Sequence, residues 1–216
     1  MTMLSKVHSS LESINKDMKD TEERREKLIK GTRDIIMLCS KSIVSLHHNE
    51  MEQARDKMET ARNMLDEFRG YAKADLYRYI VVAEQELVEA YGLRSVMEDL
   101  QIPSIDDLGV TGPSYITGLL DCIGEIKRLV LDRMRSGRER DAEKLFAIME
   151  EIYNEIYPFA VYDNFVGGVR KKLDVARMLI EDVRATVTEE NRRRAMINAL
   201  NDVDEKLKGK EGNQGR

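Results

Sequence analysis

Apolar residues recur along almost the whole chain at intervals of three and four, the spacing of a helix that buries one face. Near the N-terminus they alternate between these two intervals, as in the seam of a coiled coil. The members of this first stripe are Leu4, Val7, Leu11, Ile14 and Met18. The frame continues without proline, so we expect a first helix over residues 2–47, too long for an ordinary domain unless part of it projects or packs on another subunit.

Similar stripes predict six further helices. We expect them over residues 49–68, 72–98, 113–137, 140 to 157 or 162, 164–185, and from 188 to about 207. Asn49 and Thr188 suit N-cap positions, Gly70 suits the end of the second helix, and Pro113 suits a first helical turn. The one long connection is expected at residues 100–112.

These patterns together predict an all-α fold. No segment alternates as a strand would, and 13 Gly and 3 Pro in 216 residues are too few for a sandwich with a turn every ten residues. We expect a single-domain bundle of about seven helices over residues 1–208, with a long N-terminal helix. The polar residues 209–216 are expected to form a disordered tail.

Composition and charge limit the ligands that the protein can bind and the compartment in which we expect it. The net charge of −5 gives no basic field over the whole surface, so a nucleic acid would need a local patch. No apolar stretch is long enough to span a membrane, and the N-terminus lacks the pattern of a signal peptide. The two cysteines, Cys39 and Cys122, lie in apolar helical stretches without C-x-x-C spacing. We therefore expect a reduced, cytoplasmic protein with both cysteines buried.

The histidine and glycine patterns of the sequence exclude a metal site of the H-E-x-x-H type and a glycine-rich phosphate-binding loop. The chain has 3 histidines and no H-E-x-x-H motif, and the pair Gly167-Gly168 is not in a phosphate-loop frame. His47 and His48 fall at the end of the first helix, where imidazoles suit the carbonyl-rich terminus. We interpret both as cap or surface residues.

Carboxylates remain as candidate ligands. Glu86 and Glu89 are three residues apart, and Asp121 and Glu125 are four apart, so each pair lies on one side of its helix. Such pairs repel unless a cation or a proton is shared between them. With 40 acidic residues in 216 positions, chance alone gives about 7 pairs at any one spacing. Two interpretations therefore stay open: a metal site, or solvated and ion-paired acids.

Basic residues cluster in the first helix, around 133–140, at 170–172 and at 192–194. Such runs are usually solvated faces, but they also supply contacts to phosphate in net acidic proteins. The candidate nucleic-acid-binding residues are Arg25, Lys30, Arg33 and Arg128.

Four sequence segments, in this order, resemble the translin family, and within it the catalytic branch called translin-associated factor X. They are REKLIKGTRDIIMLCSKSIVSLHH (25–48), QELVEAY (85–91), GPSYITGLLDCIGEIKRL (112–129) and VRKKLDVARMLIEDV (169–183). Three departures from the family are visible. The family's longer insert before the Pro-Tyr segment and its basic N-terminal targeting run are missing, and the fourth helix reads GEI rather than GEL. The resemblance is therefore to a minimal, prokaryote-like member without a separate translin partner.

The resemblance implies an all-helical fold and a homo-oligomeric shell of six to eight subunits. It also implies endoribonuclease activity on single-stranded RNA inside that shell, with Mg²⁺ or Mn²⁺ as cofactor. The family's catalytic acids fall here on Glu86, Glu89, Asp121 and Glu125, of which we expect Glu89 and Glu125 to be direct metal ligands. The alternatives are a non-catalytic shell that binds single-stranded RNA or DNA, and a structural coiled-coil adaptor.

Overall fold

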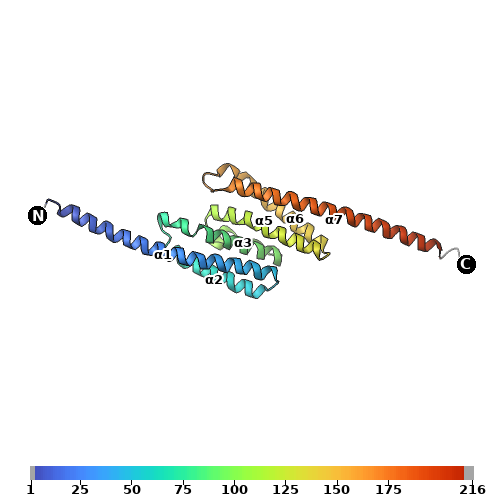
Figure 1. The fold of residues 1–216 in the computed structure, drawn as a ribbon, viewed down its shortest axis with the longest axis horizontal. Helices are drawn as coiled ribbons and strands as arrows, with labels where there is room; N and C mark the ends of the chain where they lie inside the picture. Colours follow the sequence, from blue (N-terminus) through green and yellow to red (C-terminus); the bar gives the residue numbers. More distant parts are fainter. Residues whose placement is uncertain (1–2, 212–216) are drawn as a thin grey trace.

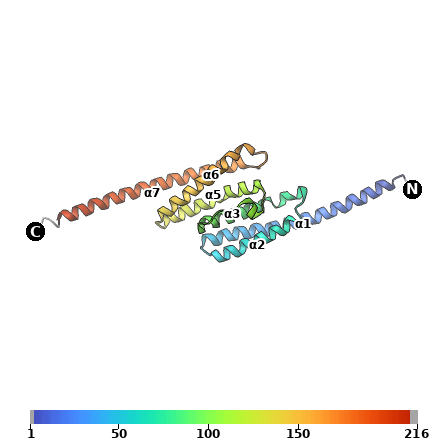
Figure 2. The same ribbon diagram turned by 180° about the vertical axis from the view of Figure 1, so that it is seen from behind.

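A computed structural model describes residues 3–211, and in that range every regular element is helical, which confirms the predicted fold class. The elements are α1 (Ser5–His47), α2 (Met51–Arg69), η1 (Ala74–Tyr79), α3 (Val81–Glu98), α4 (Ile105–Leu108), α5 (Gly112–Arg135), α6 (Glu139–Ile156), η2 (Tyr157–Tyr162) and α7 (Val169–Glu211). Figures 1 and 2 show a central body of roughly aligned helices, from which α1 and α7 project at opposite ends.

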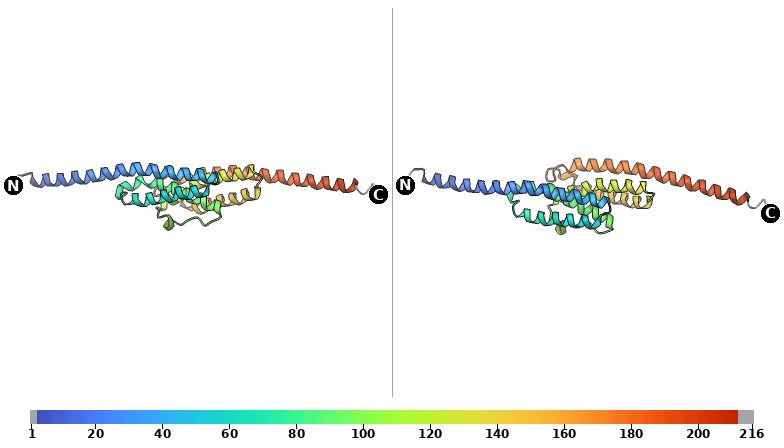
Figure 3. Two further views of the ribbon diagram at one scale, coloured as in Figure 1. Left: turned by 90° about the horizontal axis from the view of Figure 1, so that it is seen from below. Right: turned by 60° about the horizontal axis from the view of Figure 1, so that its bottom comes forward.

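The long first helix confirms its prediction and divides into two parts. In the body its seam is buried, with Leu28, Ile35 and Cys39 at 0% exposure. Toward the N-terminus the helix leaves the body, as Figure 3 shows. The apolar side chains of its predicted stripe are at least half exposed there. We call residues 5–21 the α1 arm; its exposed stripe is the one predicted to pack on another subunit.

The structure differs from the prediction at the starts of two helices, α2 and α3. Asn49 does not cap α2: it lies in the turn after α1 with φ 59°, and the N-cap is Glu50, which makes no side-chain cap bond. The expected helix over 72–98 is divided into η1 and α3. At the junction the carbonyl of Tyr79 accepts a hydrogen bond from Thr32 Oγ1 of α1 (3.0 Å). The predicted end of α2 at Gly70 is confirmed.

The two helices predicted over 164–185 and from 188 onward are one, α7, so the N-cap role given to Thr188 is wrong. No glycine or proline lies between Val169 and position 208, and nothing interrupts the backbone ladder. Of the tail expected at 209–216, residues 209–211 continue α7 and residues 212–216 lie outside the described range.

The body is layered so that α3 lies between α1 and α5, with α2 against α1 and with α6 and α7 against α5. The pair α3 and α5 approaches closely at Gly118: a Cβ there would lie 2.6 Å from the carbonyl oxygen of Gln85 and 2.7 Å from Cβ of Val88. A glycine is therefore required where the two helices that carry the candidate acids cross.

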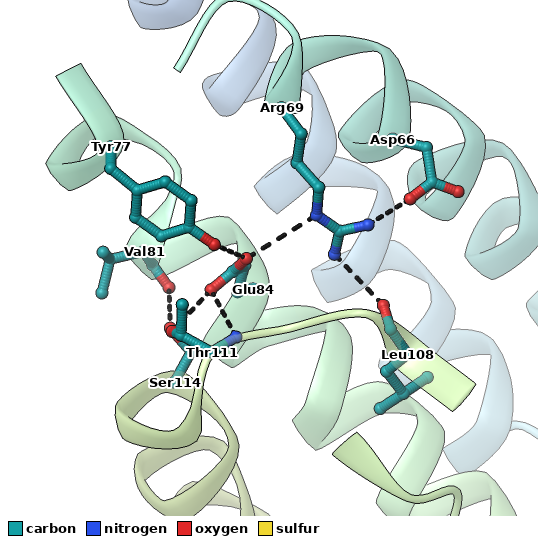
Figure 4. A network of polar contacts seen from close by, with 8 residues as sticks. All are labelled: Asp66, Arg69, Tyr77, Val81, Glu84, Leu108, Thr111 and Ser114. Carbon is teal, nitrogen blue, oxygen red and sulfur yellow. Dashed lines mark hydrogen bonds and ion pairs between the residues drawn. The ribbon is translucent and has the colours of Figure 1, made fainter. Parts of the chain in front are cut away.

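A buried polar network fastens the 100–112 connection to the body (Figure 4). Glu84, at 0% exposure, accepts hydrogen bonds from Tyr77 Oη (2.5 Å) and from Thr111 N and Oγ1 (3.2 and 2.9 Å). Arg69 approaches the same carboxylate, with Nε at 3.8 Å, and donates through Nη2 to the carbonyl of Leu108 (3.1 Å). Glu84 is thus a structural carboxylate, on the opposite side of α3 from Glu86. No helix within residues 3–211 is both long and apolar enough to cross a membrane.

Candidate metal and nucleic-acid site

The structure brings the four predicted acids together. Glu86 and Glu89 of α3 and Asp121 of α5 line a cleft of about 640 Å³, whose other wall includes Lys171 and Lys172 of α7. Glu125 lies one helical turn beyond Asp121 on α5, close enough to raise the pKa values of both glutamates on α3. The spacing on each helix and the close approach of α3 to α5 together produce this convergence.

Glu89 is the most perturbed acid of the cluster. Burial, then the charges of Glu86, Asp121 and Glu125, raise its pKa to about 8. The pKa of Glu86 is raised for the same reasons, with burial the largest cause and Asp121 next, while the nearby Ser40 side chain acts in the opposite direction. Desolvation combined with like charges is the arrangement that a bound divalent cation relieves.

Asp121 has a cation of the chain itself as its partner. Lys172 Nζ donates to both carboxylate oxygens of Asp121, and the distance to Oδ1 is 2.5 Å. Because Lys172 comes from α7, this pairing joins segments 51 positions apart in the sequence. Sequence reasoning placed this lysine only in a basic run and missed its contact with the acids.

Glu125 is held from the other side by His47 of α1. His47 Nε2 lies 2.5 Å from Glu125 Oε2, and the histidine side chain is only 2% exposed. The hydrogen bond from His47 is the largest cause that lowers the pKa of Glu125. The prediction of a cap or surface residue is therefore wrong for His47, whereas His48 is exposed. One available signal was that His47 follows the buried Ile43 by four residues.

The donor set suits Mg²⁺ or Mn²⁺, because both prefer carboxylate oxygens. Among residues 3–211, however, no three acidic, histidine or cysteine side chains are already placed around one point. The contacts explain this: Asp121 is turned to Lys172 and Glu125 to His47. The residues fit a divalent ion if the Asp121 side chain exchanges Lys172 for the metal.

The four predicted nucleic-acid-binding residues differ in their contacts and in their position relative to the acids. Arg25 is engaged by Tyr79 Oη (2.9 Å) and Glu22 (2.7 Å), whereas Lys30 and Arg33 are exposed on the same helix. Arg128 Nη1 lies 3.9 Å from Glu125 Oε2, which makes it the one member of the four that contacts an acid of the cluster within the described part of the chain.

Both cysteines are buried, as predicted. Burial, then the charges of Glu86 and Glu89, raise the pKa of Cys39 to about 12. Burial likewise raises the pKa of Cys122, with Glu89 the next cause. Thiols in this state are packing residues rather than nucleophiles.

Comparisons with known proteins agree with the fold. The profile of the Translin family matches residues 23–189. An uncharacterized protein of Methanocaldococcus jannaschii, MJ0175, is 29% identical over 166 residues, which are 76% of this chain and 74% of that protein.

Several solved structures have the same fold as this chain. The structure of an AfC3PO complex with duplex RNA is 30% identical and has a TM-score of 0.80 over 86% of this chain and 98% of that one. A crystal structure of AfC3PO gives 0.79 over the same shares at the same identity. Apo-NeC3PO, at 22% identity and a TM-score of 0.74 over 87% and 98%, shares the fold. With the family profile covering most of its length, the chain belongs to the translin family.

Proposed function

We propose that the protein is a metal-dependent endoribonuclease that cleaves single-stranded RNA inside a homo-oligomeric shell. The observation that carries this proposal is the convergence of the four acids: Glu86, Glu89 and Asp121 line one cleft, and Glu125 lies one helical turn beyond Asp121. Glu89 is desolvated, and the charges of the other three raise its pKa. Family membership supports RNA as the substrate class, and so does the likeness to an AfC3PO–duplex RNA complex.

Glu89 and Glu125 would hold Mg²⁺ or Mn²⁺ directly, with Glu86 and Asp121 completing the ligand set or orienting water. When bound, the ion would activate a water and stabilise negative charge at the phosphate. The chain's own residues define the surroundings. Lys171 and Lys172 place positive charge on the α7 wall of the cleft, where an RNA phosphate can be bound.

Local basic groups reconcile this function with the net charge of −5. Lys30 and Arg33 are exposed on α1, and Arg128 is 55% exposed beside the acids on α5. Together with the lysines of α7, they give positive charge to helices that flank the acidic cleft. The RNA backbone can therefore be bound by basic residues around the carboxylates that would hold the metal.

Cleavage of a labelled single-stranded RNA by the full-length protein tests the proposal. The reaction is run with Mg²⁺ and with EDTA, for the wild type, for Glu89→Ala/Glu125→Ala, and for Glu52→Ala/Glu59→Ala as a control on the exposed face of α2. We expect Mg²⁺-dependent cleavage by the wild type and the control, and none by the cluster variant. Full cleavage by the cluster variant would overturn the proposal.

A non-catalytic shell that binds single-stranded RNA or DNA is the second candidate. The observation that favours it is the pairing of Lys172 with both oxygens of Asp121, which neutralises one acid without a metal. It predicts salt-sensitive binding and intact RNA after long incubation with Mg²⁺. The exposed stripe of the α1 arm favours a structural adaptor instead, which predicts no RNA retention at low salt.

A further inference from the structure

His47 is an unusual residue to bury at the end of a helix. Its side chain is 2% exposed, and one ring nitrogen, Nδ1, is buried with no hydrogen-bond partner among residues 3–211. A buried polar atom left unpaired costs about 1–3 kcal/mol. An apolar side chain at this position would avoid that cost, so packing alone does not account for the histidine.

The other ring nitrogen has a specific partner. Nε2 lies 2.5 Å from Glu125 Oε2, and because an ionised carboxylate only accepts hydrogen bonds, Nε2 carries the hydrogen and donates it. The bond crosses from α1 to α5, joining residues 78 positions apart. It therefore fixes the Glu125 side chain from a helix outside the pair that carries the four acids.

The bond also determines which oxygen of Glu125 is available. Arg128 Nη1 approaches the same oxygen, Oε2, at 3.9 Å. Both contacts to Glu125 within the described part of the chain are on Oε2, so Oε1 is the oxygen left there for a ligand. Outer-shell donors that hold a carboxylate in this way commonly change metal affinity by about 10- to 100-fold when removed.

We propose that His47 is a positioning residue that orients Glu125 for divalent-cation binding. It acts through Glu125 and does not touch the ion. The inference rests on the proposed metal-dependent function and adds a residue from α1 to the site.

The test is the affinity of the full-length oligomer for Mn²⁺, measured by titration calorimetry without RNA. His47→Leu removes the donor, and His47→Gln retains an N–H donor near the position of Nε2. His48→Leu changes the adjacent exposed residue and serves as the matched control. We expect Mn²⁺ affinity to fall about 10- to 100-fold in His47→Leu, to stay within a few-fold of wild type in His47→Gln, and to be unchanged in His48→Leu.

Circular dichroism and sedimentation establish that each variant is folded and assembled. Equal Mn²⁺ affinity in wild type and His47→Leu would overturn this inference alone, whereas absence of Mn²⁺ binding in the wild type would overturn the proposed function as well. If His47→Leu does not fold, His47→Asn replaces it, because its shorter side chain does not reach Glu125. Equal Mn²⁺ affinity in His47→Asn and His47→Gln would then overturn the inference.

Discussion

Replacing Glu89 with glutamine should stabilise the metal-free protein at alkaline pH. The pKa of Glu89 is about 8 in the folded chain, against 4.5 for an unperturbed glutamate. Between these values the unfolded chain releases a proton that the folded chain retains, so the free energy of unfolding falls as pH rises from 4.5 to 8. Above pH 8 the folded chain carries the full cost of the buried charge.

The size of this cost follows from the two pKa values. At about 1.4 kcal/mol per pH unit, the difference corresponds to roughly 5 kcal/mol, which includes the repulsion by Glu86, Asp121 and Glu125. Glutamine has a similar shape and no charge. Glu89→Gln should therefore match the wild type near pH 4 and exceed its free energy of unfolding by up to about 5 kcal/mol at pH 9.

Urea unfolding in EDTA between pH 4 and pH 9 measures this difference. Glu98→Gln on the same helix is the control, with the opposite expected sign. Burial tends to raise the pKa of Glu98, but hydrogen bonds from Arg55 and Arg94 outweigh this and hold the pKa below its usual range. Saturating Mg²⁺ should remove the advantage of Glu89→Gln. A stability difference that does not change with pH would refute the reasoning.

Three further predictions follow from packing and exposure. Gly118→Ala should lower the free energy of unfolding by roughly 1–3 kcal/mol and weaken Mn²⁺ binding, because a Cβ 2.6 Å from a backbone oxygen must separate α3 from α5. In thermal unfolding the control Gly124→Ala should be tolerated, because its Cβ would make only a 3.9 Å contact. Leu11→Asp in the α1 arm should reduce the sedimenting mass and Ser9→Asp on its outer side should not; equal masses would contradict the role of the arm in subunit contacts. Arg33→Ala should weaken single-stranded RNA binding and lower its log–log salt slope by about 0.7, and an unchanged slope would remove this residue from the interface.

Periodicity predicted the helices well because each stripe is a local property of the sequence. Asn49 and Thr188 were wrongly predicted as N-caps because both residue types favour that position. In the structure Asn49 is a left-handed residue in the turn before α2, and Thr188 lies inside the continuous helix α7. Spacing could place Glu86 with Glu89 and Asp121 with Glu125, but not one pair beside the other, since that depends on how α3 packs against α5 at Gly118.

The partners of the acids were harder still to predict. Lys172 comes from α7 and His47 from α1, and neither contact has a signal in the spacing of residues along one helix. Family resemblance selected the four acids that counting could not distinguish from chance, and the structure places them near one another. It did not identify the two residues that hold Asp121 and Glu125 in the structure.

The carboxylates of α3 and α5 are proposed to form one divalent-cation site. Anomalous diffraction from crystals of the protein soaked in Mn²⁺ tests this claim most directly, because it locates the ion. We expect a peak between Glu89 and Glu125, with Lys172 displaced from Asp121. An empty cleft at saturating Mn²⁺, with Lys172 still bound to Asp121, would contradict the claim.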